Sequence, residues 1–202
     1  MRKDLRVIDG GDDEPFEDLE SADRATAGQS RARRTGDEFV ESVYKYVESA
    51  GARIARHNHR IAGEVDVDAR IVGENDRPYW LLAHGTIDDG PRAGLRRTDT
   101  VLKTIGAAYL LSRQIDRLPV ILIASHLPSP RSASGRQLAG ARLLFWDVIA
   151  SPGDLAGRHR LQAHLRDPEP QRPTNVPWMC AGVRKKELGI GQMAFEQGDE
   201  DA

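Results

Sequence analysis

The sequence predicts an α/β domain in which a central sheet is flanked by helices. Apolar residues recur at helical spacing in two segments, 35–51 and 97–115. Between these segments, residues 52–72 alternate between apolar and polar, as a half-buried strand pair does. Residues 118–128 form a continuous apolar run, which is typical of a strand buried on both faces. Helix and strand patterns that follow one another in this way favour a sheet covered by helices.

The first predicted element is a helix that begins at Thr35, a suitable N-cap with Glu38 at the capping-box position. Its apolar stripe consists of Phe39, Val43 and Val47. The preceding residues, 1–34, are highly charged and have no sustained apolar period. We therefore expect residues 1–34 to form a disordered tail.

A three-stranded meander follows, with strands expected at 52–61, 64–72 and 78–85. The short turn at Ala62-Gly63 joins the first two strands, so they should pair as an antiparallel hairpin.

The remaining elements are a long helix, a buried strand, a short helix and a last strand. Their expected ranges are 97–115, 118–128, 129–141 and 142–150. Because a helix connects strand 78–85 to strand 118–128, these two strands should run parallel, with a right-handed crossover.

The predicted domain thus covers residues 35–150. Residues 151–202 are rich in Pro, Arg and Gln at their start and acidic at their end, and we expect a linker followed by a weakly structured tail.

Composition excludes several classes of protein. The single cysteine, Cys180, rules out an internal disulfide and a cysteine-based zinc site. No apolar run approaches the roughly 18 residues of a membrane span, so we expect no membrane association and a cytoplasmic location. The net charge of −2 argues neither for nor against nucleic acid as a partner.

The stretch GEVDVDARIV (63–72) carries the most informative pattern. Glu64, Asp66 and Asp68 occupy alternate positions, so a regular strand would line one face with acid. Read by itself, this pattern favours a solvated strand face. Three like charges in a row repel one another, however, and the surrounding order of helices and strands shifts the balance toward a metal site.

The order α-β-β-β-α-β, with GEVDV opening the second strand, resembles the PD-(D/E)XK nuclease superfamily, the fold of restriction endonucleases and Holliday-junction resolvases. The resemblance covers about residues 35–150. It implies a restriction-endonuclease-like core with a mixed central sheet flanked by helices. It also implies a DNA endonuclease that depends on Mg²⁺ or Mn²⁺.

In that family an acid on the first helix, an Asp on the second strand and a Glu-x-Lys on the third converge on the metal. Carried over, the helix acid is Glu41 or Glu38, the strand carboxylate is Asp66, and Lys103 stands early in the next helix. Carboxylates suit Mg²⁺, which prefers oxygen ligands, and a nearby lysine stabilises developing charge.

The third motif departs from the pattern, because Leu82 stands where the Glu is expected and His84 where the Lys is expected. Glu64 or Asp68 could supply the second carboxylate from the same strand as Asp66. The hairpin should bring His84 beside Asp66, where a neutral histidine can bind metal or act as a base. The resemblance therefore implies Asp66, His84 and Lys103 as catalytic residues.

The implied metal ligands are Glu41, Asp66 and Asp68. The basic residues Arg92, Arg96 and Arg97 precede the helix at 97–115 and form the expected DNA-backbone contact, unless they are only a solvated helix start.

His126 is a second candidate, because parallel strands place it at the same sheet edge as His84. A turn role for Ser125 and His126 is the alternative, and a serine-hydrolase reading lacks a Gly-x-Ser-x-Gly elbow.

Two other functions remain open. One is a catalytically decayed nuclease-like domain that serves as a nucleic-acid-binding or assembly module, which Leu82 favours. The other is an α/β protein that binds a small molecule. The resemblance also allows a homodimer or a partner subunit, since many nucleases of this fold act as dimers, but the sequence identifies no interface.

Overall fold

The computed structural model describes residues 17–61, 65–87, 93–151 and 153–173. The chain divides into two compact units, Met1–Arg34 and Thr35–Ala202. The second unit contains the sheet and is described first.

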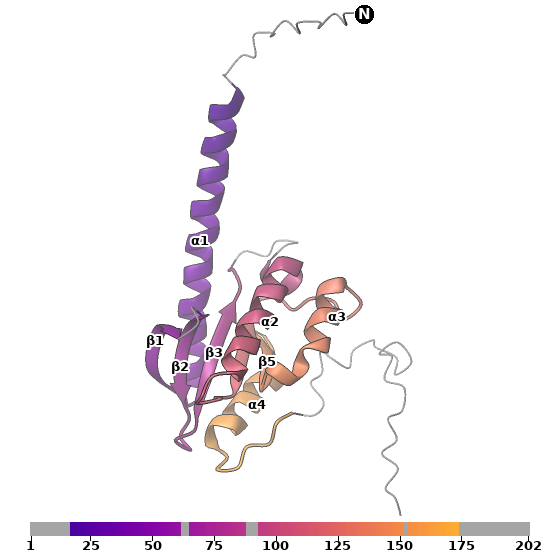
Figure 1. The fold of residues 1–202 in the computed structure, drawn as a ribbon. Helices are drawn as coiled ribbons and strands as arrows, with labels where there is room; N and C mark the ends of the chain where they lie inside the picture. The colour runs from indigo at the N-terminus through magenta and orange to yellow at the C-terminus, as the bar shows by residue number, and fades with distance from the viewer. Residues whose placement is uncertain (1–16, 62–64, 88–92, 152, 174–202) are drawn as a thin grey trace, which may run out of the picture. The chain divides into compact units, whose positions relative to one another are not determined.

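Five strands form one mixed sheet in the order β1-β2-β3-β4-β5 (Figure 1). The strands are β1 (Arg53–Ile61), β2 (Val65–Val72), β3 (Pro78–His84), β4 (Val120–Ala124) and β5 (Asp147–Ala150). The pairs β1–β2 and β2–β3 are antiparallel, whereas β3–β4 and β4–β5 are parallel. This confirms the predicted α/β class, the predicted hairpin and the predicted parallel pair.

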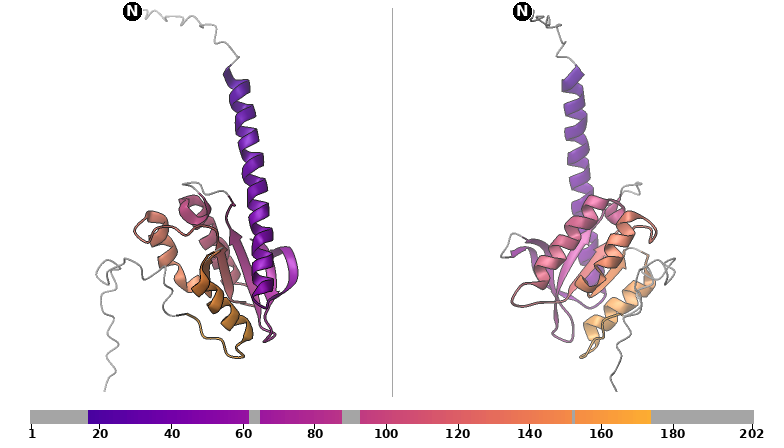
Figure 2. Two further views of the ribbon diagram at one scale, coloured as in Figure 1. Left: turned by 180° about the vertical axis from the view of Figure 1, so that it is seen from behind. Right: turned by 45° about the vertical axis from the view of Figure 1, so that its right-hand side comes forward.

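The helices cover both faces of the sheet, as the views from different sides show (Figure 2). They are α1 (Glu17–Ser49), α2 (Thr98–Ser112), α3 (Ala133–Gly140) and α4 (Leu155–Arg166), with short 3₁₀ turns at Gly94–Arg96 and Arg142–Leu144.

Two apolar clusters hold these layers together. In one, the α1 residues from Phe39 onward and two α4 leucines pack on one face of the sheet. In the other, α2 and α3 pack on the opposite face. Burial of fully enclosed aliphatic side chains on both faces is the main stabilising term for such a sandwich.

The predicted start of α1 at Thr35 is wrong, because the helix already begins at Glu17. Residues 17–34 are therefore helical instead of disordered. The segment is rich in Ala and Arg, which favour helix. Extending a helix that packing has already nucleated costs far less than starting a new one.

The predicted linker after residue 150 is also wrong in part, because α4 packs on the sheet. Asp154 caps the helix by accepting a hydrogen bond from the Gly157 N–H (2.7 Å). Leu161 and Leu165 are fully buried. The α/β unit therefore continues through α4, and residues 174–202 lie outside the described residues.

Within the part of the chain that the structure describes, none of the helices combines the length and the apolar character of a membrane span.

Candidate functional site

The buried side chains of strand β2 switch from one face of the sheet to the other at Asp68. A regular strand would place Val65, Val67, Ala69 and Ile71 on one face. Instead, the first two pack in the cluster under α2 and α3, and the last two pack in the cluster under α1 and α4. The face presented to each helix layer therefore changes between Val67 and Ala69.

The neighbouring strand bends at the same level. Asn58 of β1 lies across from Asp68, between the pairs His57–Ala69 and His59–Val67. Its φ of 41° is in the left-handed region, which Asn tolerates better than most residues. The backbone of β1 is thus also irregular across from Asp68.

Tyr44 of α1 fixes this bend. Its hydroxyl donates to the Asp68 carbonyl oxygen (2.7 Å) and lies 3.4 Å from the Asn58 Oδ1. The ring also packs edge-on against His57. A buried tyrosine therefore ties the first helix to both strands at the point where they turn over.

The Asp68 carboxylate lies at a fork between β2 and β3. Paired residues of these two strands run from Ala69–Val72 on one side and Pro78–Leu81 on the other. Beyond this pairing, Asp68 Oδ2 accepts a hydrogen bond from the Ala83 N–H (2.8 Å). The Asp68 side chain thus bridges β2 and β3 where the two strands separate.

Burial raises the pKa of Asp68 to about 6, although the hydrogen bond from the Ala83 N–H opposes the shift. Among the described residues, no lysine, arginine or histidine forms an ion pair with it. A partly buried carboxylate without a cation is costly, and such groups are concentrated at functional sites.

Glu41 lies on the same side of the sheet as Asp68. It is exposed and stands one helical turn before Tyr44. Burial raises the pKa of Tyr44 to about 12, and the charges of Asp68 and Glu41 add to this shift. The charges of both carboxylates therefore act on the Tyr44 hydroxyl, which places Glu41 and Asp68 around the same tyrosine.

His84 ends β3, one residue after the Ala83 that binds Asp68. Burial lowers the pKa of His84 to about 4, so the ring is neutral at pH 7. Leu82, two residues earlier, packs under α2 and α3. The alternation of the strand therefore places His84 on the α2 side, whereas Glu41 belongs to α1 on the other face.

The prediction that Asp66 is the principal carboxylate is not supported by its surroundings. Asp66 is exposed and forms an ion pair with Arg60 across the hairpin (2.9 Å). That hydrogen bond lowers the pKa of Asp66. The bend at Asp68 separates the two acids that a regular strand would have placed together. Glu64 lies outside the described residues.

The predicted residues on and before α2 are not brought to this fork. Lys103 is exposed, on the side of α2 away from its buried stripe. Arg97 forms an ion pair with Asp99 (2.9 Å), and Arg96 is exposed. Arg92 lies outside the described residues.

Ser125 and His126 have the turn role that was the alternative for them. Ser125 Oγ accepts from the Thr86 N–H (3.1 Å) and lies 2.8 Å from His126 Nδ1. The Leu95 N–H donates to the His126 carbonyl (3.0 Å). These contacts join the end of β4 to the loop before α2.

The metal was expected at a set of three carboxylates. Among the residues that the structure describes, no three His, Cys, Asp or Glu side chains are grouped closely enough to hold an ion. Asp68 and Glu41 leave two carboxylates, and Mg²⁺ is often held by one or two carboxylates together with substrate phosphates. The donor set therefore fits a metal that substrate helps to bind.

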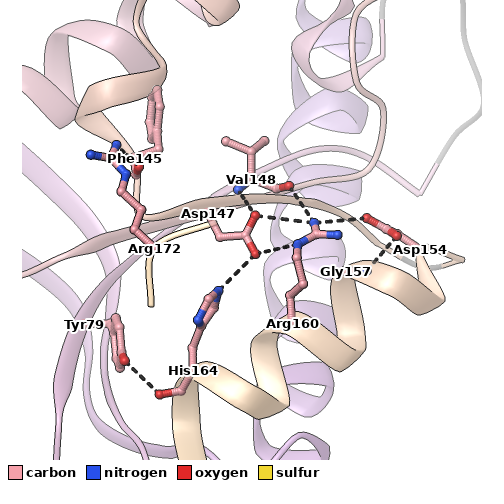
Figure 3. Close-up of polar contacts among 9 residues, drawn as sticks. All are labelled: Tyr79, Phe145, Asp147, Val148, Asp154, Gly157, Arg160, His164 and Arg172. Carbon is pink, nitrogen blue, oxygen red and sulfur yellow. Dashed lines mark hydrogen bonds and ion pairs between the residues drawn. The ribbon is translucent and has the colours of Figure 1, made fainter. Parts of the chain in front are cut away.

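A second polar cluster, formed by Asp147, Arg160 and His164, was not predicted from the sequence (Figure 3). Asp147 at the start of β5 is fully buried and accepts from Arg160 Nε (2.9 Å), while His164 Nε2 lies 3.2 Å from the same Oδ2. Both partners come from α4. The only available signal was a lone acid in the apolar stretch FWDVIA (145–150).

A cavity of about 340 Å³ lies next to this cluster. Its lining includes Arg160, His164, Asp167 and Arg172. Arg172 donates to the carbonyl of Arg142 (2.7 Å), and burial lowers its pKa. Both cationic and acidic groups line the opening, so the cavity does not select a ligand by charge.

Comparison with known proteins leaves the assignment to the geometry: no protein-family model, no curated protein and no solved structure matches this chain.

Proposed function

We propose that this chain is a restriction-endonuclease-like domain that hydrolyses DNA phosphodiester bonds with a divalent metal ion, and that Asp68 is the principal ligand. The single observation that supports this most strongly is the Asp68 carboxylate itself. It is partly buried at a strand fork, its pKa is raised to about 6, and it has no ion-pair partner among the described residues. A bound cation would relieve that cost.

Each nearby residue has a role that its surroundings allow. Asp68 and Glu41 would hold Mg²⁺ or Mn²⁺, which supplies Lewis acidity and lowers the pKa of an attacking water. His84 is neutral, and with a pKa of about 4 it is a weak base at pH 7. Because His84 lies on the α2 face, opposite the α1 face that carries Glu41, we assign it no contact with the metal. Lys103 has no role in this proposal.

DNA would meet the protein through its phosphates. Arg96 and Arg97 are exposed at the beginning of α2, where helix N–H groups also point outward. Such contacts position the backbone without reading the base sequence. The proposal therefore predicts salt-sensitive binding with little sequence preference from this surface.

The test compares two neighbouring acids. Supercoiled plasmid and linear duplex are incubated with the wild type, Asp68→Asn and Asp66→Asn, in Mg²⁺ and in Mn²⁺. We expect Asp68→Asn to abolish cleavage, because an amide holds a cation poorly, and Asp66→Asn to retain it. Cleavage by the wild type should fall as the pH drops below about 6, since protonated Asp68 no longer attracts the ion.

Circular dichroism of each variant establishes that its fold is intact. Loss of cleavage in Asp66→Asn but not in Asp68→Asn would instead support Asp66, the ligand that the family resemblance implies. Absence of cleavage by the wild type in both metals would refute the enzyme.

A nucleic-acid-binding module without catalysis is the second candidate, and Leu82 favours it. Leu82 stands where the family has the Glu of the Glu-x-Lys motif on its third strand. It is 1% exposed and lies in an apolar cluster. A salt titration distinguishes it: binding that weakens steeply with salt, without cleavage, supports the module. Absence of both binding and cleavage would leave neither candidate standing.

A further inference from the structure

Helix α2 presents an apolar stripe to solvent. Leu102, Tyr109 and Leu110 are 52%, 54% and 44% exposed, which is unusual for large apolar side chains on one helix. With Gly106 between them, they recur at spacings of three and four residues, so they share one face. Val101, Thr104, Ala108 and Leu111 form the opposite face and are buried on the sheet.

Gly106 has no explanation within a single chain. It stands in the middle of a helix, where glycine is less favourable than alanine. A Cβ at this position would meet no atom within 4 Å, so packing inside the unit does not require its absence. Glycine at an exposed helix position is useful where a second helix crosses closely.

The charges on this face are arranged symmetrically about Gly106. In an antiparallel pair of α2 helices that cross at Gly106, residues equally far before and after it face each other. Leu102 then faces Leu110 of the second copy. Asp99, which also pairs with Arg97 of its own chain (2.9 Å), faces Arg113, the C-cap residue of the second helix. Lys103 faces Tyr109, a cation–aromatic pair.

We propose that the exposed face of α2 is the interface through which two copies of this chain associate, antiparallel, with Gly106 at the crossing. The occupant is a second copy because the pattern is complementary to itself: each apolar residue meets an apolar one and each charge meets its opposite or an aromatic ring. A two-fold axis requires this self-complementarity.

The expected dimer is weak. Helix α2 has 15 residues, and at a rise of about 1.5 Å per residue it is about 22 Å long. One helix pair buries less surface than a standard stable interface. The chain should therefore exchange between monomer and dimer at micromolar concentrations.

Sedimentation equilibrium of the full chain at several concentrations tests this, with Gly106→Leu, Tyr109→Asp and Leu155→Asp as variants. Gly106→Leu and Tyr109→Asp should be monomeric where the wild type dimerises. Leu155→Asp is the matched control, since Leu155 is 72% exposed but lies on α4. It should dimerise like the wild type.

Gly106→Leu also guards against unfolding as the cause. A Cβ at position 106 meets open space in the single chain and leucine favours helix over glycine, so the thermal midpoint at low concentration should not fall. Arg113→Glu should weaken the dimer by placing two acids opposite each other, and adding Asp99→Lys should restore it. Failure of this restoration would overturn the antiparallel register.

A wild type that stays monomeric at every concentration would overturn the proposal. So would a dimer that neither Gly106→Leu nor Tyr109→Asp weakens. Neither result depends on DNA cleavage, so the interface stands or falls separately from the proposed function.

Discussion

Asp68 accepts a hydrogen bond from Ala83, the residue before His84, and burial disfavours the charged form of both Asp68 and His84. For Asp68 the pKa rises from 3.8 to about 6, and for His84 it falls from 6.5 to about 4. The two shifts have opposite consequences for the dependence of stability on pH, because one group is an acid and the other a base.

For Asp68, the folded protein binds more protons than the unfolded chain between about pH 4 and pH 6, so its contribution to the free energy of unfolding falls as pH rises. For His84, the folded protein binds fewer protons between about pH 4 and pH 6.5, so its contribution rises with pH. In the wild type the two contributions largely cancel.

Single substitutions should separate them. In urea denaturation between pH 4 and pH 7, Asp68→Asn should gain stability relative to the wild type as pH rises, by at most about 3 kcal/mol. His84→Asn should lose stability relative to the wild type over the same interval. Differences from the wild type remove the contributions of other groups. Two difference curves with the same sign would contradict the assigned pKa shifts.

At the scale of elements, the turn after β2 holds the end of α4. Asn75 Nδ2 donates to the carbonyls of His164 (2.9 Å) and Asp167 (2.6 Å), and the Asn75 N–H donates to Leu165 (3.1 Å). The last carbonyls of a helix have no partner within the helix, so this turn acts as a cap supplied from elsewhere in the chain. Gly73 makes the close approach possible.

The same substitution at two glycines should therefore have opposite effects. A Cβ at Gly73 would lie 2.5 Å from the Leu165 carbonyl oxygen, which is backbone, so Gly73→Ala should lower the free energy of unfolding by about 1–3 kcal/mol. At Gly106 a Cβ meets open space, so Gly106→Ala should raise it by about 1 kcal/mol. Urea denaturation at low protein concentration measures both. A stabilised Gly73→Ala would show that α4 is not held in this way.

At the scale of the whole molecule, α4 completes the domain that the sequence pattern appeared to end at residue 150. Asp147, with Arg160 and His164, lies between β5 and this helix. Without α4, the buried carboxylate would lose both partners, which costs several kcal/mol. Leu161 would also leave an apolar cavity beside the sheet.

Truncation should show this directly. Residues 35–173 are expected to unfold cooperatively with a near-ultraviolet spectrum like that of the full chain. Residues 35–150 should not, although they contain all five strands. Cooperative unfolding of the shorter chain, with native-like aromatic signals, would mean that α4 is an accessory.

The strands were predictable because periodicity depends on local sequence. Alternation in 52–72 and the apolar run at 118–128 predicted strand positions that β1, β2 and β4 confirm, with bounds that differ by a few residues. Helix α4 was missed because its stripe has only two core leucines, Leu161 and Leu165, inside a polar segment.

For the candidate site, the sequence predicted the strand that carries the acids but not which of them is buried. The pattern drew attention to the acids of β2, and the family resemblance added Glu41 to the same group. Alternation placed Glu64, Asp66 and Asp68 on one face, because it assumes a straight strand, and the family resemblance then selected Asp66. The local sequence VDVD (65–68) contains no signal that predicts this change of face. The residues that contact Asp68 there, Tyr44 and Asn58, come from other elements.

The sequence by itself therefore determined the α/β class, the order of the strands and the acid-rich strand, since these depend on side-chain period and chain connection. Only the tertiary structure decided which acid is desolvated, which is paired with Arg60, and where the domain ends. The physical reason is that burial and pairing are set by neighbours distant in sequence. Tyr44 of α1 is hydrogen-bonded to β2 where its side chains switch faces. Helix α4 packs on the sheet although it lies beyond the expected boundary at residue 150.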